Sequence, residues 1–230
     1  MTESPKDLAA AIQSTLINPD ATRAEIVTHV ESCARYGFNA AMIAMCWVPL
    51  AKDILIGTGV KTATFIDFAM GNTSIGGKIA LIKECRRLGA DEVDYAPNMG
   101  YYLSKMYPEF KKEAEALVDA SEGMPLKAML QIGMIKSHDE KRRAVQLLEE
   151  AQVDWIKNSS GGWAPGATPA SVEDIRLIKQ SLRGYSRVKA SGGINNREIA
   201  VALLEAGAEL LGTSRGIEIV EGKNNITGNY

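Results

Sequence analysis

The 230-residue chain is poor in the residues that most often carry metal or triad chemistry. Its two histidines, His29 and His138, lie in polar, helix-like stretches without a surrounding cluster of cysteines or carboxylates. A zinc site needs several such ligands together, and a Ser-His-Asp triad needs a histidine beside its nucleophile. We therefore expect no metal and no cofactor, and chemistry that relies on other side chains.

Cysteines and long apolar runs are also scarce. The cysteines Cys33, Cys46 and Cys85 are scattered and odd in number, which fits a reducing cytoplasm better than a disulfide framework. No apolar run approaches the roughly 18 residues of a membrane span, and the N-terminus lacks the pattern of a signal peptide. Lys and Arg total 26 against 28 Asp and Glu, so charge favours neither nucleic acid nor an anionic membrane as a partner.

What the chain does contain is an alternation of short apolar runs and longer amphipathic ones. Unbroken apolar runs are typical of strands in a parallel sheet, because both faces of such strands are buried. We expect strands at residues 38–45, 60–68, 92–96, 126–132, 155–157, 187–190 and 210–213, and an eighth within 8–17. We expect helices at residues 22–36, 49–57, 78–88, 107–120, 137–150, 171–181 and 195–206.

Eight strand–helix units in a chain of 230 residues fit an α/β fold of the compact (β/α)8 TIM-barrel type. An open doubly wound sheet is the alternative. However, no Gly-x-Gly-x-x-Gly follows an early strand, and the glycine-rich loops lie late in the chain. Without a visible linker, we predict a single barrel domain over residues 1–222 and a short polar tail over 223–230.

Two lysines stand at matching places in two predicted strands. Lys157 ends an apolar run and precedes Asn-Ser-Ser-Gly-Gly, and Lys189 lies within Val-Lys-Ala-Ser-Gly-Gly. Burial in an apolar strand removes water from the ammonium group, which favours the neutral, nucleophilic amine. A single lysine at a strand end usually reaches solvent, but two at matching positions are hard to explain by packing.

Catalytic groups of a barrel gather at the C-terminal ends of its strands. Asp94, Lys127, Lys157 and Lys189 belong to the fourth to seventh predicted strands, so they should face one mouth. Neighbouring ammonium groups lower the pKa of each other, so one amine stays neutral near neutral pH. Asp94 beside them can exchange protons through a water. This combination of amines and a carboxylate is typical of a Schiff-base enzyme.

Glycine-rich loops follow the last three predicted strands. Glycines let backbone N–H groups approach an anion, and a following helix N-terminus adds its positive end. The loops after the seventh and eighth strands are the usual phosphate site of such barrels, although any one of them alone reads as a plain turn. We expect a small phosphorylated sugar as partner, with Arg215 either touching the phosphate or only reaching solvent. The expected binding residues are Gly161, Ser191, Gly192, Gly193, Gly212, Thr213, Ser214 and Arg215.

These motifs resemble the deoxyribose-phosphate aldolase family over residues 8–222. The match includes Gly-Ala-Asp-Glu-Val-Asp at 89–94, Leu-Lys at 126–127, Lys-Asn-Ser-Ser-Gly at 157–161, Val-Lys-Ala-Ser-Gly-Gly-Ile at 188–194 and Gly-Ala-Glu-Leu-Leu-Gly-Thr-Ser at 207–214. The resemblance implies a metal-independent class I aldolase on a (β/α)8 barrel. It implies that Lys157 forms the Schiff base, Lys189 tunes it, Asp94 relays protons and Lys127 supports that relay. It also adds two substrate-binding positions, Thr15 and Asn18.

Three positions depart from the usual pattern of the family. Gln13 stands in place of an aspartate, Gln131-Ile-Gly in place of Glu-Thr-Gly, and Asp67-Phe-Ala in place of Gly-Phe-Pro. We expect none of them to touch the two lysines or Asp94. The Schiff-base chemistry should then be intact, while the walls that read substrate hydroxyls have changed.

The first functional hypothesis is cleavage of 2-deoxyribose 5-phosphate into acetaldehyde and glyceraldehyde 3-phosphate. One alternative is a Schiff-base aldolase for a different phosphorylated sugar, and another is a non-catalytic sugar-phosphate-binding barrel. The oligomeric state is not readable from the sequence, and because small barrels often pair, a homodimer or higher homo-oligomer stays open alongside a monomer.

Two smaller features leave alternatives open. Met42, Met45 and Cys46 at the end of the second strand line the mouth or, as we prefer, pack in the core. Tyr230 ends the polar tail and would act as a lid and proton donor if the tail crossed the mouth, although disorder is the usual state of a polar terminus.

Overall fold

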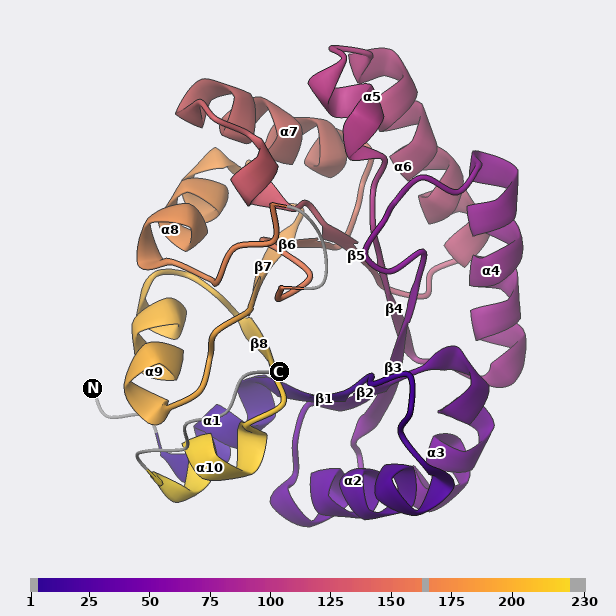
Figure 1. Cartoon of the computed structure of the whole chain (residues 1–230), viewed down its shortest axis with the longest axis vertical. Helices are drawn as coiled ribbons and strands as arrows, with labels where there is room; N and C mark the ends of the chain where they lie inside the picture. The colour runs from indigo at the N-terminus through magenta and orange to yellow at the C-terminus, as the bar shows by residue number, and fades with distance from the viewer. Residues whose placement is uncertain (1–3, 163–165, 224–230) are drawn as a thin grey trace.

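The chain folds into a closed barrel of parallel strands. The computed structural model describes residues 4–162 and 166–223, in which the strands pair in chain order and β8 closes onto β1 (Figure 1). The strands are β1 (Ile12–Leu16), β2 (Ala40–Ile43), β3 (Lys61–Ile66), β4 (Glu92–Tyr95), β5 (Leu126–Met129), β6 (Trp155–Lys157), β7 (Arg187–Ser191) and β8 (Leu210–Thr213). The predicted TIM barrel is confirmed, including a strand in the first apolar segment.

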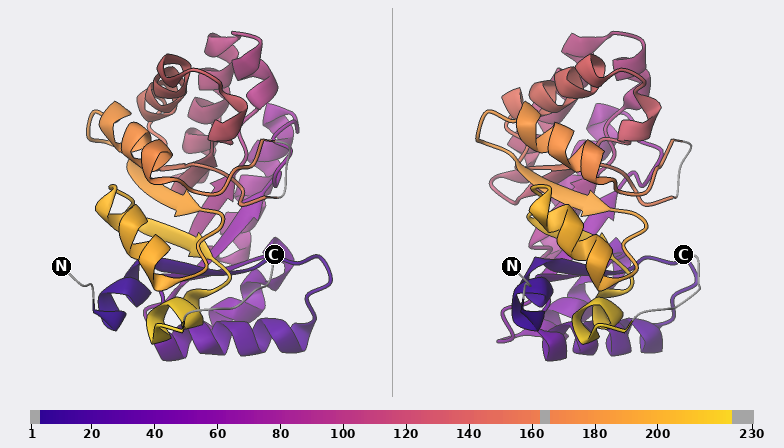
Figure 2. Two further views of the ribbon diagram at one scale, coloured as in Figure 1. Left: turned by 60° about the vertical axis from the view of Figure 1, so that its left-hand side comes forward. Right: turned by 90° about the vertical axis from the view of Figure 1, so that its left-hand side faces the viewer.

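Helices surround the strands on the outside, as the side views also show (Figure 2). They are α1 (Pro5–Ala11), α2 (Arg23–Tyr36), α3 (Val48–Leu55), α4 (Ile75–Leu88), α5 (Met99–Leu103), α6 (Tyr107–Ser121), α7 (His138–Glu150), α8 (Val172–Ser181), α9 (Arg197–Glu205) and α10 (Gly216–Glu221). Two single 3-10 turns, η1 (Met45–Trp47) and η2 (Ile132–Met134), follow β2 and β5. The main helices lie where the sequence predicts them.

Local capping explains where the helices begin and end. Thr22 and Glu25 form a capping box at the start of α2, which ends at Gly37 in the left-handed conformation. Ser4 and Asp7 form a second capping box, which starts α1 before the apolar segment 8–17, and the helix extends into that segment as far as Ala11. The short helices α5 and α10 were not predicted, because five and six residues are too few to show a helical period.

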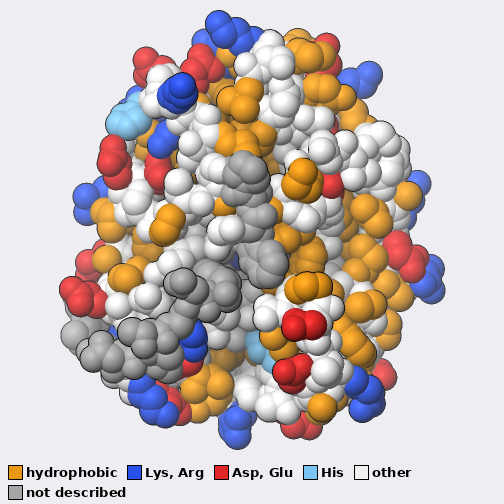
Figure 3. Space-filling view, in the orientation of Figure 1, with side chains coloured by type: hydrophobic (Ala, Val, Ile, Leu, Met, Phe, Trp, Pro, Cys, Tyr) orange, Lys and Arg blue, Asp and Glu red, His pale blue; other side chains and the backbone are white. Residues whose placement is uncertain are grey.

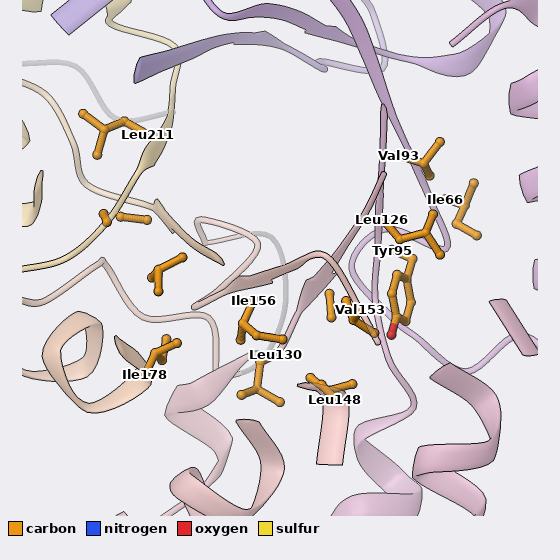
Figure 4. Packing of buried hydrophobic residues seen from close by; sticks show 14 of the residues in the cluster. Ile66, Val93, Tyr95, Leu126, Leu130, Leu148, Val153, Ile156, Ile178 and Leu211 are labelled. Carbon is orange, nitrogen blue, oxygen red and sulfur yellow. The ribbon is translucent and has the colours of Figure 1, made fainter. Parts of the chain in front are cut away.

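Side chains along each strand alternate between the helices and the barrel interior. In β4, Val93 and Tyr95 point into the layer between strands and helices (Figure 4). That layer is the main hydrophobic core, and helix residues such as Leu148 complete it. The alternation sends the other two residues of β4, Glu92 and Asp94, into the interior.

The interior of the barrel has an apolar side and a charged side. On the apolar side, Ala40, Met42 and Ala63 of β2 and β3 form a small cluster that is separate from the main core. On the charged side, strands β4 to β7 carry the buried carboxylates and amines. The chemistry of this protein is therefore concentrated on one half of the barrel wall.

The outer surface carries charges of both signs. On the face seen in Figure 3, they gather around the rim of the molecule, and apolar and uncharged groups lie nearer the middle. Within the two described ranges, no helix has both the length and the apolar character needed to cross a membrane. Tyr230 lies outside the described residues, so the predicted tail and its boundary stay predictions.

Candidate active site

Two lysines share one carboxylate oxygen at the centre of the charged side. Lys157 Nζ lies 3.0 Å and Lys189 Nζ lies 2.8 Å from Asp94 Oδ2. The side chains of Lys189 and Asp94 are each 1% exposed, and that of Lys157 is 8% exposed. Lys157 and Lys189 are direct partners in the β6–β7 register, so strand pairing itself places the two amines side by side.

The third lysine and a second carboxylate join this group from the neighbouring strands. Lys127 Nζ lies 2.5 Å from Glu92 Oε2 and 3.5 Å from Asp94 Oδ1. Gln13 on β1 donates from Nε2 to Glu92 Oε2 at 2.8 Å, and its Oε1 accepts from Lys189 Nζ at 2.7 Å. The expectation that Gln13 does not touch the lysines is therefore wrong, because barrel closure pairs β1 with β8, whose other neighbour is β7.

These contacts form a closed ring. It runs from Asp94 through Lys189, Gln13, Glu92 and Lys127 back to Asp94. We call these five residues the inner ring, and Lys157 is attached to it at Asp94. At the N-terminal end of β3, the half-exposed Lys61 also reaches Glu92, with 2.5 Å between Nζ and Oε1.

Burial and mutual charge set the protonation of this group. Burial lowers the pKa of Lys189 to about 7, a shift that Asp94 opposes and that Lys157 and Lys127 reinforce. Burial alone would raise the pKa of Asp94, but the ammonium groups of Lys189, Lys157 and Lys127 hold it well below its usual range. Asp94 is therefore a permanent carboxylate, and Lys189 changes its charge near neutral pH.

A pocket opens above the charged side at the C-terminal ends of the strands. Lys157 and Asp94 line it, together with Ser160, Ser191 and Gly212. Lys189 is not among the lining residues, and its side chain is 1% exposed against 8% for that of Lys157. The structure thus separates a lysine that can meet a ligand from one that can only act on its neighbours.

The opposite wall of the pocket is apolar. It includes Met42, which the sequence suggested either for the mouth or for the core, and which belongs to both. Cys46, by contrast, is exposed, and Met45 is half-buried against the main core. The other apolar lining residues, not predicted from the sequence, are Ile17, Phe65 and Phe68 on this wall and Met129 on β5, which pairs with Lys157 in the strand register.

The side chains at the other two altered positions, Asp67 and Gln131, are hydrogen-bonded to residues of the protein itself. The carboxylate of Asp67 accepts hydrogen bonds from the Thr73 amide and hydroxyl, at 3.0 and 2.9 Å, and lies 3.4 Å from Lys78 Nζ. Gln131 makes two hydrogen bonds to Ser160. These polar groups organise the loops around the pocket, so their appearance in the sequence does not mean that they read a substrate.

The loops after β6 and β7 meet beside the pocket. A Cβ atom on Gly192 would lie only 3.1 Å from Gly161 Cα, and Gly192 and Gly193 both have the positive φ that favours glycine. Asn158 joins the loops, since Nδ2 donates to Ser191 O and Oδ1 accepts from Ser191 N. Gly161, Ser191, Gly192 and Gly193 are thus brought together as predicted.

The remaining predicted binding residues are distributed more widely. Thr15 lines the pocket, whereas Asn18 is exposed in the turn after β1. Thr213 is buried, donates its hydroxyl to Ile194 O and accepts from Arg215 N. Ser214 lies in a separate groove that is also lined by His29, and Arg215 pairs with Glu218.

Glu92 is the main site residue that the sequence interpretation missed. It lies two residues before Asp94 on the same strand, which puts both carboxylates on the same face. That spacing was visible in the sequence, whereas its contact with Gln13 across the barrel was not.

Comparison with known proteins bears on this site. No family model matches the chain. The deoxyribose-phosphate aldolase of Geobacillus sp. (strain WCH70) is 36% identical over 217 residues, which cover 94% of this chain and 96% of the relative. That of Thermoanaerobacter sp. (strain X514) is 37% identical over 223 residues, with 96% and 98% covered.

Solved structures of aldolases are also similar to this chain. The aldolase QR15 superposes with a TM-score of 0.86 at 32% identity, covering 94% of this chain and 95% of that chain. The deoxyribose phosphate aldolase from Aeropyrum pernix, described as a tetramer, has a TM-score of 0.85 at 26% identity, with 95% and 91% covered. Full-length relatives above 30% identity and a matching barrel establish that the chain belongs to the deoxyribose-phosphate aldolase family of lyases.

Proposed function

We propose that this protein cleaves 2-deoxyribose 5-phosphate to acetaldehyde and glyceraldehyde 3-phosphate through a Schiff base on Lys157. The observation that carries the proposal is the shared oxygen of Asp94, which contacts both the amine of Lys157, a residue that lines the pocket, and the amine of Lys189, a buried residue that does not. A buried second amine disfavours a second positive charge, which leaves a neutral amine available as a nucleophile.

The reaction begins when Lys157 Nζ adds to the carbonyl carbon of the open-chain sugar. Loss of water gives an iminium ion, which draws electrons as the hydroxyl two carbons away loses its proton and the intervening C–C bond breaks. Glyceraldehyde 3-phosphate leaves as the new aldehyde. The resulting enamine takes up a proton on carbon, and water then releases acetaldehyde and the free lysine.

The inner ring supplies the proton transfers. Asp94 stays ionised and holds both amines in place, so it stabilises the positive charge of the iminium ion. Lys189, whose pKa is lowered to about 7 by burial, accepts and returns a proton near neutral pH. Lys127 supports this exchange by bridging Asp94 and Glu92.

We place the phosphate at the loops that follow β6 to β8. Ser191 lines the pocket, and the contact between Gly192 and Gly161 makes one glycine-rich rim from two loops. Gly193 continues that rim, Gly212 and Thr213 end the adjoining strand β8, and Ser214 and Arg215 follow it. Thr15 and Asn18 would complete the substrate contacts from β1.

The test is reductive trapping followed by peptide mass spectrometry. Incubation with acetaldehyde and a hydride donor should give a stable ethyl adduct on Lys157, absent from Lys157→Met. Release of glyceraldehyde 3-phosphate from 2-deoxyribose 5-phosphate should then be measured with a coupled assay. An adduct without turnover would favour an aldolase for another sugar phosphate, and no adduct on any lysine would favour a binding protein.

The altered residues are compatible with the proposed substrate. Gln13 is buried beneath Lys189, Asp67 is bound to Thr73, and Gln131 is bound to Ser160. Because their polar groups are engaged within the protein, they are not a reason to expect a different sugar. This weakens the alternative of another phosphorylated substrate, and the paired buried lysines argue against a non-catalytic barrel.

The assembly state and the cellular location are separate proposals. We propose a homo-oligomer, because the Aeropyrum pernix relative is described as a tetramer. Light scattering of the purified chain would give its mass in solution directly. A cytoplasmic location is proposed from the scattered cysteines, and fractionation of the source cell would test it.

A further inference from the structure

Asp67, the first residue after β3, holds its own loop together through its carboxylate. Oδ2 accepts a hydrogen bond from Thr73 N at 3.0 Å, and Oδ1 accepts one from Thr73 Oγ1 at 2.9 Å. The backbone carbonyl of Asp67 also accepts from Gly71 N at 3.1 Å. One residue is thus bonded both to the middle and to the far end of the segment 67–73.

A buried lysine connects this loop to the rest of the barrel. Lys78 on α4 is fully buried, and its Nζ lies 3.4 Å from Asp67 Oδ2 and donates to Gly71 O at 2.9 Å. Gly71 packs directly on the loop after β4, since a Cβ atom added to it would overlap Pro97 O. We call Asp67, Thr73 and Lys78 the loop clamp, because together they fix the loop after β3 against its neighbour.

Phe68 lies inside this clamped loop and belongs to the pocket. Its ring is part of the apolar wall, with 4.9 Å between the ring centroids of Phe68 and Phe65. Phe65 is held by β3, to which it belongs, whereas Phe68 comes after the strand has ended. The place of the Phe68 ring opposite Lys157 therefore depends on the conformation of residues 67–73.

The two residues that flank Phe68 depart from the usual family sequence in a related way. Asp67 stands in place of a glycine and has a φ of 49°, in the region that favours glycine. Ala69 stands in place of a proline, whose ring would restrict the backbone after Phe68. The loop thus lacks the restraint of a proline on one side of Phe68, and on the other side it has a carboxylate that a glycine could not supply.

We propose that Asp67 is a positioning residue, which holds Phe68 in the pocket wall through the loop clamp and so replaces the restraint of the usual proline. The inference rests on the proposed Schiff-base function, which it deepens by assigning how the wall opposite Lys157 is fixed. Asp67 is not among the lining residues, so its removal alters substrate binding only through a neighbour.

The test is a double-variant cycle in steady-state kinetics with 2-deoxyribose 5-phosphate. Asp67→Gly removes the carboxylate at a position whose φ glycine adopts freely. We expect KM to rise about fivefold and kcat to change less than about twofold, because Lys157 and Asp94 are untouched. In the Phe68→Ala background the same change should leave KM within about twofold, since its effect passes through the missing ring. A similar rise in both backgrounds would overturn the proposal.

A second pair of variants tests the exchange with proline. Adding Ala69→Pro to Asp67→Gly restores the usual Gly-Phe-Pro, and KM should return to within about twofold of the wild-type value. A KM as high as that of Asp67→Gly alone would refute the exchange. Asp67→Asn keeps an acceptor for Thr73 but loses the charge that faces Lys78, and an intermediate KM supports the role of the carboxylate.

Fluorine nuclear magnetic resonance separates this inference from the proposed function. The chain has four phenylalanines, so labelling with fluorophenylalanine gives few signals, and Phe68→Leu identifies that of Phe68. The informative variant is Thr73→Val, which removes the hydroxyl contact to Asp67 but leaves the sequence neighbours of Phe68 unchanged. It also covers the case in which Asp67→Gly does not fold.

The outcomes are then distinct. If the wild type does not cleave 2-deoxyribose 5-phosphate, the proposed function fails, and the Phe68 signal still decides the inference. A signal that shifts or broadens in Thr73→Val supports the positioning role, and a signal that stays in place contradicts it. If the wild type is active but folded Asp67→Gly and Thr73→Val keep its KM, the role of Asp67 is refuted and the aldolase stands.

Discussion

Gln131 and Ser160 hold each other through two hydrogen bonds of 2.8 Å. Gln131 Nε2 donates to Ser160 Oγ, and Ser160 N donates to Gln131 Oε1. Since Ser160 Oγ accepts from the amide, its own proton is free to point toward the pocket that it lines. A residue that the sequence interpretation assigned to substrate reading thus acts by orienting a serine.

Replacing Gln131 should therefore weaken substrate binding more than chemistry. Gln131→Met removes both contacts to Ser160, and we expect KM to rise about tenfold with kcat nearly unchanged. Steady-state kinetics on the phosphorylated sugar give both constants. Gln131→Glu is the matched control, because it keeps an acceptor for the Ser160 amide. Its KM should lie between that of the wild type and that of Gln131→Met. A KM equal to that of the wild type in Gln131→Met would contradict the role of this pair.

Gly212 on β8 makes room for the second lysine. A Cβ atom at this position would lie 2.8 Å from Ser191 Oγ and 3.2 Å from Lys189 Cε. We expect Gly212→Ala to push Lys189 away from Asp94 and to lower kcat at least about tenfold, because misplaced catalytic groups lose much of their effect. Gly76→Ala is the control, since nothing lies within 4 Å of its added methyl group. Unchanged kcat in Gly212→Ala would show that the lysine has more freedom than the packing suggests.

His29 should make stability depend on pH. Burial lowers its pKa from 6.5 to about 4, while its contact with Ser14 O opposes the shift. Between these values the unfolded chain binds a proton that the folded chain does not, so the free energy of unfolding falls as the pH drops from 6.5 and levels off below about 4. We expect a loss of about 3 kcal/mol across this window.

Urea denaturation at a series of pH values measures this effect. His29→Gln should flatten the profile in that window, since the glutamine does not titrate. His138, whose side chain is 55% exposed, provides the control, and His138→Gln should keep the wild-type slope. Equal slopes in the wild type and His29→Gln would mean that other groups carry the dependence.

Lys78 connects the loop after β3 to the loop after β4 through hydrogen bonds. Its fully buried Nζ donates to Gly71 O at 2.9 Å, Ala96 O at 2.8 Å and Glu113 Oε1 at 2.8 Å. Lys78→Met leaves the Glu113 carboxylate buried without its counter-charge, and we expect the free energy of unfolding to fall by about 3–5 kcal/mol. The double variant Lys78→Met/Glu113→Gln should recover part of this loss in chemical denaturation. Should both proteins be equally unstable, the loop contacts rather than the ion pair would be the cause.

The site residues that could be predicted from the sequence are those whose placement depends on local pattern. Asp94, Lys157 and Lys189 could be assigned because each lies at an inward position near the end of a strand, where barrel geometry concentrates chemistry. The contact between Gln13 and Glu92 joins residues 79 positions apart, and no local signal marks it. It exists only because the barrel closes and brings the first strand across from the fourth.

The polar residues around the pocket show a second limit of prediction from the sequence. Asp67 and Gln131 stood out by type, and type alone suggested contact with a substrate. Their hydrogen-bond partners, Thr73 and Ser160, are neutral residues that no charge pattern links to them. A side chain can be predicted to be polar and inward-facing without any indication of which atom it will bind.

The two-sided interior means that shape and reactivity are encoded in different parts of the chain. Met42 and Phe65, in the first three strand–helix units, belong to the apolar wall of the pocket, while β4 to β7 carry the amines and carboxylates. Exchanging side chains on the apolar wall should therefore alter substrate range without retuning the chemistry. A barrel divided in this way offers protein engineers one half to vary and one half to leave alone.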